Sequence, residues 1–286
     1  MKTLVILQGN ARGGEETWNS MYRYLLEPLK ADLALLFGKT NDHSSSLYRK
    51  CKYLWELEEY NNWRQYYEKN FPESHRWFKV FEHNQSQTLG GGVDNFIGSG
   101  AISLAFRHFL KKNFKNILLK YDRIILTRSD YFYIDNHPVL SNDYFYIIEG
   151  EDNGGLNDRH HIFSKNIIDK VLGVLEFLDS IENNKYLTTL DKFLNIEKFL
   201  KLFYERNGLV SCIKRFKSAQ FTVALSTDKT RWQRGKYYML GSKIILIKYK
   251  NEYYSAIKIK YGLFLSFFIK SLYYIKNKYF LRIRNK

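Results

Sequence analysis

Short apolar runs alternate with a segment of helical periodicity at the start of the chain. Residues 3–7 and 33–37 are almost wholly apolar, and between them apolar residues recur at helical spacing over residues 16–29. A short apolar run bounded by polar or glycine residues is typical of a strand that is buried on both faces, as in a parallel sheet. The order strand, helix, strand therefore predicts a βαβ unit and an α/β fold.

Another apolar run lies in the middle of the chain, at residues 124–126, and ends abruptly at Thr127-Arg128-Ser129-Asp130. We interpret this run as a buried strand of the same sheet. The same reasoning, applied to the rest of the chain, gives a set of expected elements. It predicts strands at residues 77–82, 132–134, 144–148 and 216–225, helices at residues 47–59, 102–112, 167–178 and 195–206, and an irregular helical layer over residues 60–77.

Polar residues at the end of the central strand mark a candidate ligand site, because open α/β sheets bind their ligands at the carboxyl ends of their strands. Arg128 and Asp130 stand two residues apart at this point. A guanidinium and a carboxylate at such an edge suit an anionic ligand, such as a nucleotide diphosphate with a metal ion.

The first predicted strand runs into a glycine-rich segment, Gln8-Gly9-Asn10-Ala11-Arg12-Gly13-Gly14. Its glycines allow tight turns and a close approach of the backbone to a ligand, and Arg12 adds a cation that pairs with phosphate. The segment does not match the GxGxxG fingerprint and so does not indicate dehydrogenase chemistry. A glycine-rich turn without a ligand is the alternative. Residues 85–100 form another glycine-rich loop, which either covers the nucleotide or only turns the chain.

The polar segment 149–164, which follows the strand predicted at residues 144–148, contains several carboxylates, an Arg and two His. That mixture supplies a general base, a metal ligand and a phosphate clamp. Asp158 is the favoured base, ahead of Glu151 and Asp152, and its alternative role is to cap a helix that begins near His160. Adjacent side chains point in different directions, so we expect at most one of His160 and His161 to face the site. A structural hydrogen bond is the alternative for either.

A basic loop follows the last predicted strand, at residues 226–235, and holds Lys229, Arg231, Trp232 and Arg234. Cations at this position would neutralise a diphosphate leaving group as a glycosidic bond breaks. A solvated surface loop is the alternative.

The length and the cysteines narrow the class of protein. With 286 residues, the chain buries a real core as one large domain or two small ones. Cys51 and Cys212 lie far apart without a CxxC pattern, which predicts a reducing compartment and neither a disulfide framework nor a zinc site. The first apolar run is too short for a signal peptide or a membrane span, so we expect it to be the first strand of a cytosolic domain.

The net charge of +16 is concentrated at one end of the chain. Residues 241–286 hold eleven Lys or Arg and one Glu, which gives +10 of the +16. Nucleic-acid binding would call for a basic face with a recognisable motif, and none is seen. We therefore divide the chain into a globular domain, residues 1–240, and a basic, aromatic C-terminal segment, residues 241–286. From residue 261 that segment suits an anionic membrane surface, with a helix docked on the body as the alternative.

Four motifs follow one another along residues 1–240: residues 8–14, Thr127-Arg128-Ser129-Asp130, Asn157-Asp158-Arg159 and Thr230-Arg231-Trp232. This combination resembles bacterial glycosyltransferases of lipopolysaccharide and capsule synthesis, most nearly the WavE-like lipopolysaccharide synthesis proteins. The resemblance implies a GT-A-like fold, which is a Rossmann-type mixed sheet flanked by helices. Such enzymes usually carry Asp-x-Asp, whose carboxylates hold Mn²⁺ or Mg²⁺ on the donor diphosphate. Here Arg128 replaces the first Asp, which leaves Asp130 as a single ligand or Arg128 as a partial substitute for the metal's charge.

The motifs and the resemblance together predict a hexosyltransferase that moves a sugar from a nucleotide-sugar donor to a lipopolysaccharide, lipooligosaccharide or capsule acceptor, which is a glycolipid or an oligosaccharide. We expect it on the cytoplasmic face of the inner membrane, without nucleic acid as a partner. Another nucleotide-dependent transferase and a basic nucleic-acid-binding protein are the alternatives. The predicted site residues are Asp158, Asp130, Glu151 and Asp152 for catalysis, Gly9, Asn10, Arg12, Gly13, Arg128, Arg159 and Arg231 for the donor, and Asp130 and His160 for a metal ion.

Overall fold

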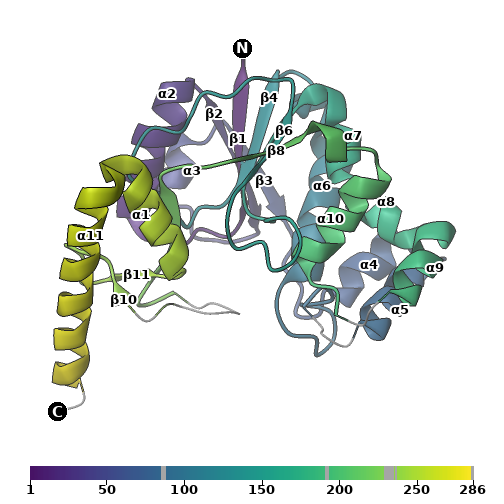
Figure 1. Ribbon diagram of the computed structural model, residues 1–286. Helices are drawn as coiled ribbons and strands as arrows, with labels where there is room; N and C mark the ends of the chain where they lie inside the picture. The colour runs from purple at the N-terminus through teal and green to yellow at the C-terminus, as the bar shows by residue number, and fades with distance from the viewer. Residues whose placement is uncertain (85–87, 191–192, 229–234, 236, 285–286) are drawn as a thin grey trace.

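The computed structural model describes residues 1–84, 88–190, 193–228, 235 and 237–284 of the chain. These residues form a larger sheet flanked by helices, with a smaller sheet beside it (Figure 1). The predicted α/β class, with a mixed sheet between helices, is confirmed.

The larger sheet has seven strands in the order β3-β2-β1-β4-β7-β6-β8. The first four of these run parallel, β7 runs antiparallel to both of its neighbours, and β6 and β8 are again parallel. The carboxyl ends of six strands and the amino end of β7 therefore share one edge of the sheet. The strands are β1 (Thr3–Gly9), β2 (Asp32–Gly38), β3 (Tyr53–Leu57), β4 (Arg123–Thr127), β6 (Phe145–Ile148), β7 (His161–Ser164) and β8 (Ile213–Phe216).

Both faces of the central strands are buried, as their apolar runs predict. Alternate residues of β1 enter opposite cores, Leu4 and Ile6 on one face and Val5 and Leu7 on the other. All five residues of β4 are buried. This burial holds the ends of β1 and β4 in fixed positions relative to each other, because the two strands pair directly.

Helices cover both faces of the larger sheet (Figure 1). α6 contributes to the core on one face, and α1 contributes to the core on the other. The helices are α1 (Gly14–Met21), α2 (Glu27–Leu29), α3 (Ser46–Lys50), α4 (Arg64–Asn70), α5 (Arg76–His83), α6 (Gly100–Leu118), α7 (Ile168–Leu172), α8 (Val174–Asp179), α9 (Ile181–Thr189), α10 (Ile196–Arg206) and α11 (Lys250–Arg284), with a π-helical turn at Tyr22–Leu26 and 3₁₀ turns at Lys165–Ile167 and Val210–Cys212.

The smaller sheet is antiparallel and has the order β10-β11-β9-β5. Its strands are β5 (Tyr131–Tyr133), β9 (Gln220–Leu225), β10 (Tyr237–Tyr238) and β11 (Ile245–Ile247). The chain thus passes from β4 in one sheet to β5 in the other within three residues, 128–130. The candidate residues Arg128 and Asp130 lie at this crossing between the sheets.

Two predicted elements are wrong. The helix predicted at residues 47–59 ends at Lys50, and residues 53–57 form the edge strand β3, in which Trp55 and Leu57 are buried and Leu54 is exposed. This alternation has the period of a strand. The strand predicted at residues 77–82 is part of helix α5, which buries Trp77, Val80 and Phe81, because their spacing of three and four residues places them on one helical face.

The predicted C-terminal segment divides into two parts. Its beginning packs into the body, where β11 and the first two turns of α11 share a core with β9; Ile245, Ile247, Tyr253 and Ile257 are buried there. At Gly262 the backbone leaves helical geometry, with φ 73° and ψ 179°. Beyond it α11 extends away from the body (Figure 1). Within the part of the chain that the structure describes, no helix is long and apolar enough to cross a membrane.

Candidate functional site

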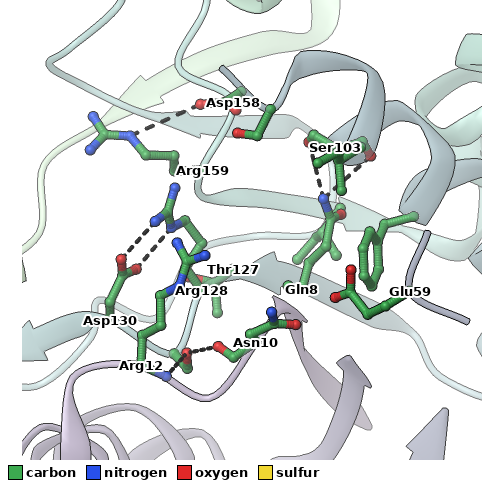
Figure 2. A pocket seen from close by; sticks show the side chains of 16 residues that line it. Gln8, Asn10, Arg12, Glu59, Ser103, Thr127, Arg128, Asp130, Asp158 and Arg159 are labelled. Atoms are coloured by element: carbon green, nitrogen blue, oxygen red, sulfur yellow. Dashed lines mark hydrogen bonds and ion pairs between the residues drawn. The ribbon is translucent and has the colours of Figure 1, made fainter. Parts of the chain in front are cut away.

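A hollow lies at the shared edge of β1, β4 and β7 (Figure 2). Arg12 reaches it from the loop after β1, Arg128 and Asp130 from the end of β4, and Asp158 and Arg159 from the segment before β7. The last two arrive there because β7 is antiparallel, so that the residues before it meet the carboxyl end of β4. We call this space the β1–β4 hollow.

Arg128 and Asp130 form a two-pronged ion pair at the end of β4. Nε of Arg128 donates to Oδ1 of Asp130 at 2.8 Å, and Nη2 donates to Oδ2 at 2.6 Å. Burial alone would raise the pKa of Asp130, but the Arg128 guanidinium, with Lys248 and Arg12 farther away, lowers that pKa to about 2. Asp130 is therefore a carboxylate at neutral pH, and both of its oxygens are already bound.

Ser129 joins the end of β4 to the loop after β1. Its hydroxyl donates to the backbone oxygen of Asn10 at 2.7 Å and accepts from the backbone N–H of Arg12 at 3.0 Å. Gly9 and Gly13 have φ values of +116° and +88°, which favour glycine, so the loop turns sharply beside the hollow. Gly9, Asn10 and Arg12 line the hollow, whereas Gly13 lies outside its lining.

Arg159 is buried among groups of β9 and α11. Its side chain is 6% exposed; Nη2 lies 2.8 Å from Oε1 of Glu252 on α11, and Nη1 donates to the hydroxyl of Thr222 at 3.1 Å. The guanidinium also lies over the ring of Tyr249, 4.6 Å from its centre. The other oxygen of Glu252 accepts from the backbone N–H and the hydroxyl of Thr222. Glu252, in the first turn of α11, thus fixes the position of Arg159 in the hollow.

We expect Glu252→Gln to lower the free energy of unfolding by about 3 kcal/mol, because it removes the nearer of the two carboxylates that pair with the buried Arg159, 2.8 Å away against 4.0 Å for Asp158. Urea unfolding of the two proteins measures this difference. Glu182→Gln is the matched control, since Glu182 pairs with Arg206 at the surface, where its side chain is 84% exposed. An equal effect of the two changes would contradict the role of Glu252.

Asp158 lies between the β1–β4 hollow and an adjoining one, and it lines both. The adjoining space, which we call the α10 hollow, is also lined by Glu151, Asn153 and Glu197. Burial, with Asp158 nearby as a second cause, raises the pKa of Glu197 to about 7. The alternative role of Asp158 as a helix cap is wrong, because residues 161–164 form the strand β7.

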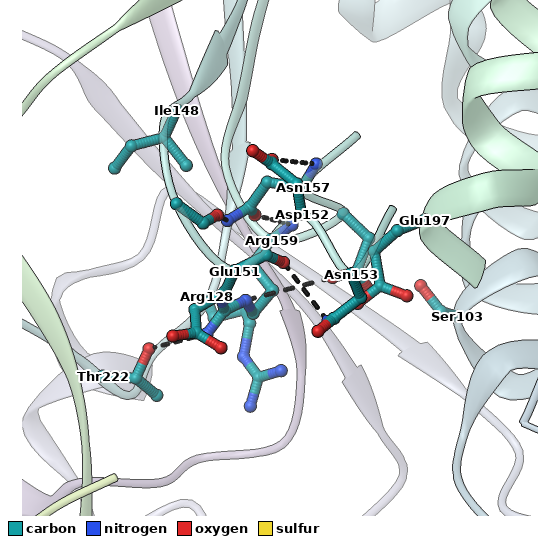
Figure 3. Close-up of polar contacts among 12 residues, drawn as sticks. Ser103, Arg128, Ile148, Glu151, Asp152, Asn153, Asn157, Arg159, Glu197 and Thr222 are labelled. Atoms are coloured by element: carbon teal, nitrogen blue, oxygen red, sulfur yellow. Dashed lines mark hydrogen bonds and ion pairs between the residues drawn. The ribbon is translucent and has the colours of Figure 1, made fainter. Parts of the chain in front are cut away.

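Glu151 and Asp152 are neighbours in one loop, but their side chains have different surroundings (Figure 3). Glu151 faces the α10 hollow. Asp152 lines neither hollow: its Oδ1 accepts from Nη2 of Arg215 at 2.6 Å and from the backbone N–H of Asn157 at 3.1 Å. Asn153 links the loop to α10 by donating to Glu197 at 2.7 Å. Asp152 therefore holds its own loop in place and does not face either hollow, in contrast to its predicted catalytic position.

His160 is fully buried and lines neither hollow. Its Nδ1 lies 2.8 Å from the hydroxyl of Thr127, and its Nε2 lies 3.2 Å from Nε2 of His137. His161 is equally buried, and its Nε2 donates to the backbone oxygen of Asn157 at 2.7 Å. Burial lowers the pKa of both histidines. The structure does not bring His160 into the hollow with Asp130.

The residues around Asp130 do not fit a divalent metal ion. Both oxygens of Asp130 accept from Arg128, and the other groups that bear on its charge are the cations Lys248 and Arg12. A hard divalent cation needs several oxygen ligands, commonly more than one of them a carboxylate. Within the described ranges, no group of three or more His, Cys, Asp or Glu side chains is arranged to hold a metal ion.

Several site residues were missed by the sequence analysis. Lys248 and Tyr249 line the α10 hollow, and Gln8 lines the β1–β4 hollow while donating to the hydroxyl of Ser103 on α6 at 3.0 Å. Lys248 directly follows the apolar run 244–247, which is the same kind of signal that indicated Arg128 and could have identified Lys248. Arg231, with its loop from 229 to 234, lies outside the described residues.

No protein-family model matches the chain, and no curated protein matches it. Among solved structures, the chain is similar to mouse xyloside xylosyltransferase 1 in its apo form, with a TM-score of 0.42 and 14% sequence identity. The match covers 76% of this chain and 85% of that one. The function proposed below therefore rests on the residues of the site.

Proposed function

We propose that the protein is a glycosyltransferase that moves a sugar from a nucleotide-sugar donor to a carbohydrate acceptor. The observation that carries this proposal is the β1–β4 hollow, where Arg12, Arg128 and Arg159 face the same space as the carboxylate of Asp158. Guanidinium groups suit a diphosphate. A carboxylate beside them suits an acceptor hydroxyl that must lose its proton as it reacts.

The proposed reaction is a displacement at the anomeric carbon. The acceptor oxygen forms the new bond to that carbon, and its proton passes to the carboxylate of Asp158. The bond between the carbon and the diphosphate oxygen breaks, and its electron pair leaves with the diphosphate. Arg12 and Arg128 stabilise this added negative charge, while Glu252 holds Arg159 in place beforehand, so little reorganisation is needed.

The α10 hollow is the proposed acceptor site. Its walls carry Glu151, Asn153, Asn195 and Glu197, which offer hydrogen-bond acceptors and donors to the hydroxyl groups of a saccharide. It meets the β1–β4 hollow along Arg12, Arg128, Asp158 and Arg159, which line both hollows, and Asp158 is the residue that would receive the proton. We propose a lipopolysaccharide, lipooligosaccharide or capsule saccharide as this acceptor, in line with the motif order of the chain.

A thermal-shift screen against nucleotide sugars tests the proposal, because a ligand that binds the folded state raises the melting temperature. We expect at least one nucleotide sugar to raise the melting temperature more than its nucleoside monophosphate does. Stabilisation by nucleotides that carry another transferable group, but by no nucleotide sugar, would contradict the proposal and point to a different nucleotide-dependent transferase.

We also propose that α11 beyond Gly262 lies on the anionic cytoplasmic face of the inner membrane. Phe264 is 93% exposed, and further large apolar side chains beside it are exposed as well. Lys258, Lys260 and Lys270 lie on the same helix, and the sequence of residues 273–286 adds five Lys or Arg. Exposed aromatic residues among cations suit a surface of anionic lipid headgroups. The exposed apolar residues beyond Gly262 are Leu263, Phe264, Leu265, Phe267, Phe268 and Leu272.

Cosedimentation with phosphatidylglycerol vesicles tests this placement. We expect the full chain to bind, and we expect the triple change Phe264→Ser, Phe267→Ser and Phe268→Ser to weaken binding at least about tenfold, because each Phe loses apolar area that the lipid would bury.

The matched control changes three exposed apolar residues elsewhere: Val139→Ser, Ile181→Ser and Val210→Ser. This control should bind as the unaltered chain does. Equal loss in both triple variants, or no loss in the α11 variant, would contradict the membrane proposal.

A further inference from the structure

Lys248 is a buried ammonium group that forms no ion pair within the described residues. The residue is 8% exposed, follows strand β11 directly and lines the α10 hollow. Within the described residues, no carboxylate oxygen lies within 4.0 Å of its nitrogen, although fifteen such ion pairs occur elsewhere in the structure. A buried charge is costly unless it is paired, so this position calls for an anion.

Three arginines near Lys248 make this part of the site strongly positive. Asp130 acts on Lys248 as an anion at longer range, and Arg128 already binds both oxygens of Asp130. Burial, and then repulsion by the three arginines, lowers the pKa of Lys248 to about 8. The charged groups that act on Lys248 are Arg128 and Asp130 from the crossing between β4 and β5, Arg12 from the loop after β1 and Arg159 from the segment before β7, and its nitrogen lies 5.7 Å from the centre of the Tyr249 ring. The carboxylates of Glu151, Asp158 and Glu197 line the same hollow.

We propose that Lys248 and Arg128 bind the diphosphate of the donor directly and take the place of the divalent metal ion. The inference rests on the proposed function for the identity of the donor, and it adds how this site holds the diphosphate. In such an enzyme carboxylates would hold a metal ion, which would supply positive charge to the diphosphate. Here Arg128 already binds both oxygens of Asp130. Arg128 lines both hollows, and Lys248 lies in the α10 hollow close enough to Arg128 for their charges to interact, so a diphosphate held where the two hollows meet would contact both cations.

The proposal requires that diphosphate binding changes the protonation of Lys248. An anion beside the ammonium favours its charged form and raises its pKa. Near pH 8 a fraction of Lys248 is neutral before binding and charged afterwards, so binding takes up protons from the buffer. Near pH 6 Lys248 is already charged, and this uptake disappears.

Isothermal titration calorimetry with UDP, GDP and inorganic pyrophosphate tests the proposal without sugar transfer. Titrations at pH 8 in two buffers of different ionisation enthalpy measure proton uptake. We expect at least one of these probes to bind in the presence of EDTA, with an affinity that Mg²⁺ or Mn²⁺ does not improve. Lys248→Met should weaken binding by about tenfold or more and abolish the uptake.

Two further variants separate charge from folding. Lys248→Arg keeps a charge that does not titrate, so it should bind the probe without proton uptake. Lys170→Met removes an exposed lysine on α7 and should change neither quantity.

Binding that is lost in EDTA and restored by Mn²⁺ would overturn the proposal, and so would equal uptake by the unaltered chain and Lys248→Met. If the probe binds without metal and with uptake, but no nucleotide sugar is ever turned over, the diphosphate site stands and the glycosyltransferase proposal fails alone.

Discussion

Asp158→Asn is expected to lower kcat for sugar transfer by roughly 10²–10⁴, because it removes the group that accepts the proton of the acceptor hydroxyl. The amide keeps the shape of the side chain, which lies between the two hollows with 18% of its surface exposed. Diphosphate binding depends on the cations and should remain close to that of the unaltered protein. Steady-state kinetics of transfer, together with titration of the nucleoside diphosphate, measures both quantities.

Two neighbouring carboxylates provide the controls for this result. Glu151→Gln and Glu197→Gln alter the wall of the α10 hollow and should raise the KM for the acceptor more than they lower kcat. A loss of kcat in Glu197→Gln that equals the loss in Asp158→Asn would assign the base to Glu197, whose pKa is raised to about 7 by burial and by Asp158. That outcome would contradict the role given to Asp158.

Arg128→Met is expected to remove diphosphate binding and to lower the free energy of unfolding by about 3 kcal/mol, because it leaves Asp130 buried without its cation. The double variant Arg128→Met, Asp130→Asn removes both charges and should regain much of the stability without regaining the binding. Urea unfolding and calorimetry measure the two effects separately. Recovery of binding in the double variant would contradict the role of Arg128 as a diphosphate ligand.

The stability loss in Arg128→Met is also expected to depend on pH. In the unaltered protein the pKa of Asp130 is about 2, below its ordinary value of 3.8, so its stabilising contribution is present above about pH 4 and lost as the pH falls towards 2. Without Arg128 burial raises this pKa. The gap in stability between the two proteins should therefore widen as the pH rises from about 2 to about 5. A gap that does not change with pH would show that the ion pair is not its cause.

The positions of Arg128 and Asp158 followed from simple sequence signals. The apolar run 124–126 is long enough only for a short buried strand, and a strand that stops at charged residues places them at the edge of a sheet. The glycine-rich segment after β1 met the same edge because β1 and β4 are direct neighbours. Asp158 lies at that edge because it precedes strand β7, where the alternative interpretation expected a helix to begin.

Lys248 and Glu252 were not recognised because the charge of the C-terminal segment obscured their pattern. Their neighbours form a short strand and a helix that pack against β9, but eleven cations in residues 241–286 favoured a separate tail. The pairing of Glu252 with Arg159 joins residues 93 positions apart, and no local periodicity encodes such a contact. Strand β3 was predicted as part of a helix and helix α5 as a strand. Short aromatic segments fit both the two-residue period of a strand and the 3.6-residue period of a helix.

Release of nucleoside diphosphate from a panel of nucleotide sugars tests the central claim most directly, because slow transfer to water requires no knowledge of the acceptor. The unaltered protein is predicted to release diphosphate from at least one nucleotide sugar in the presence of EDTA, and Arg128→Met is predicted to release none above background. Absence of release from every nucleotide sugar when an acceptor extract is also supplied, or equal release by Arg128→Met, would contradict the account.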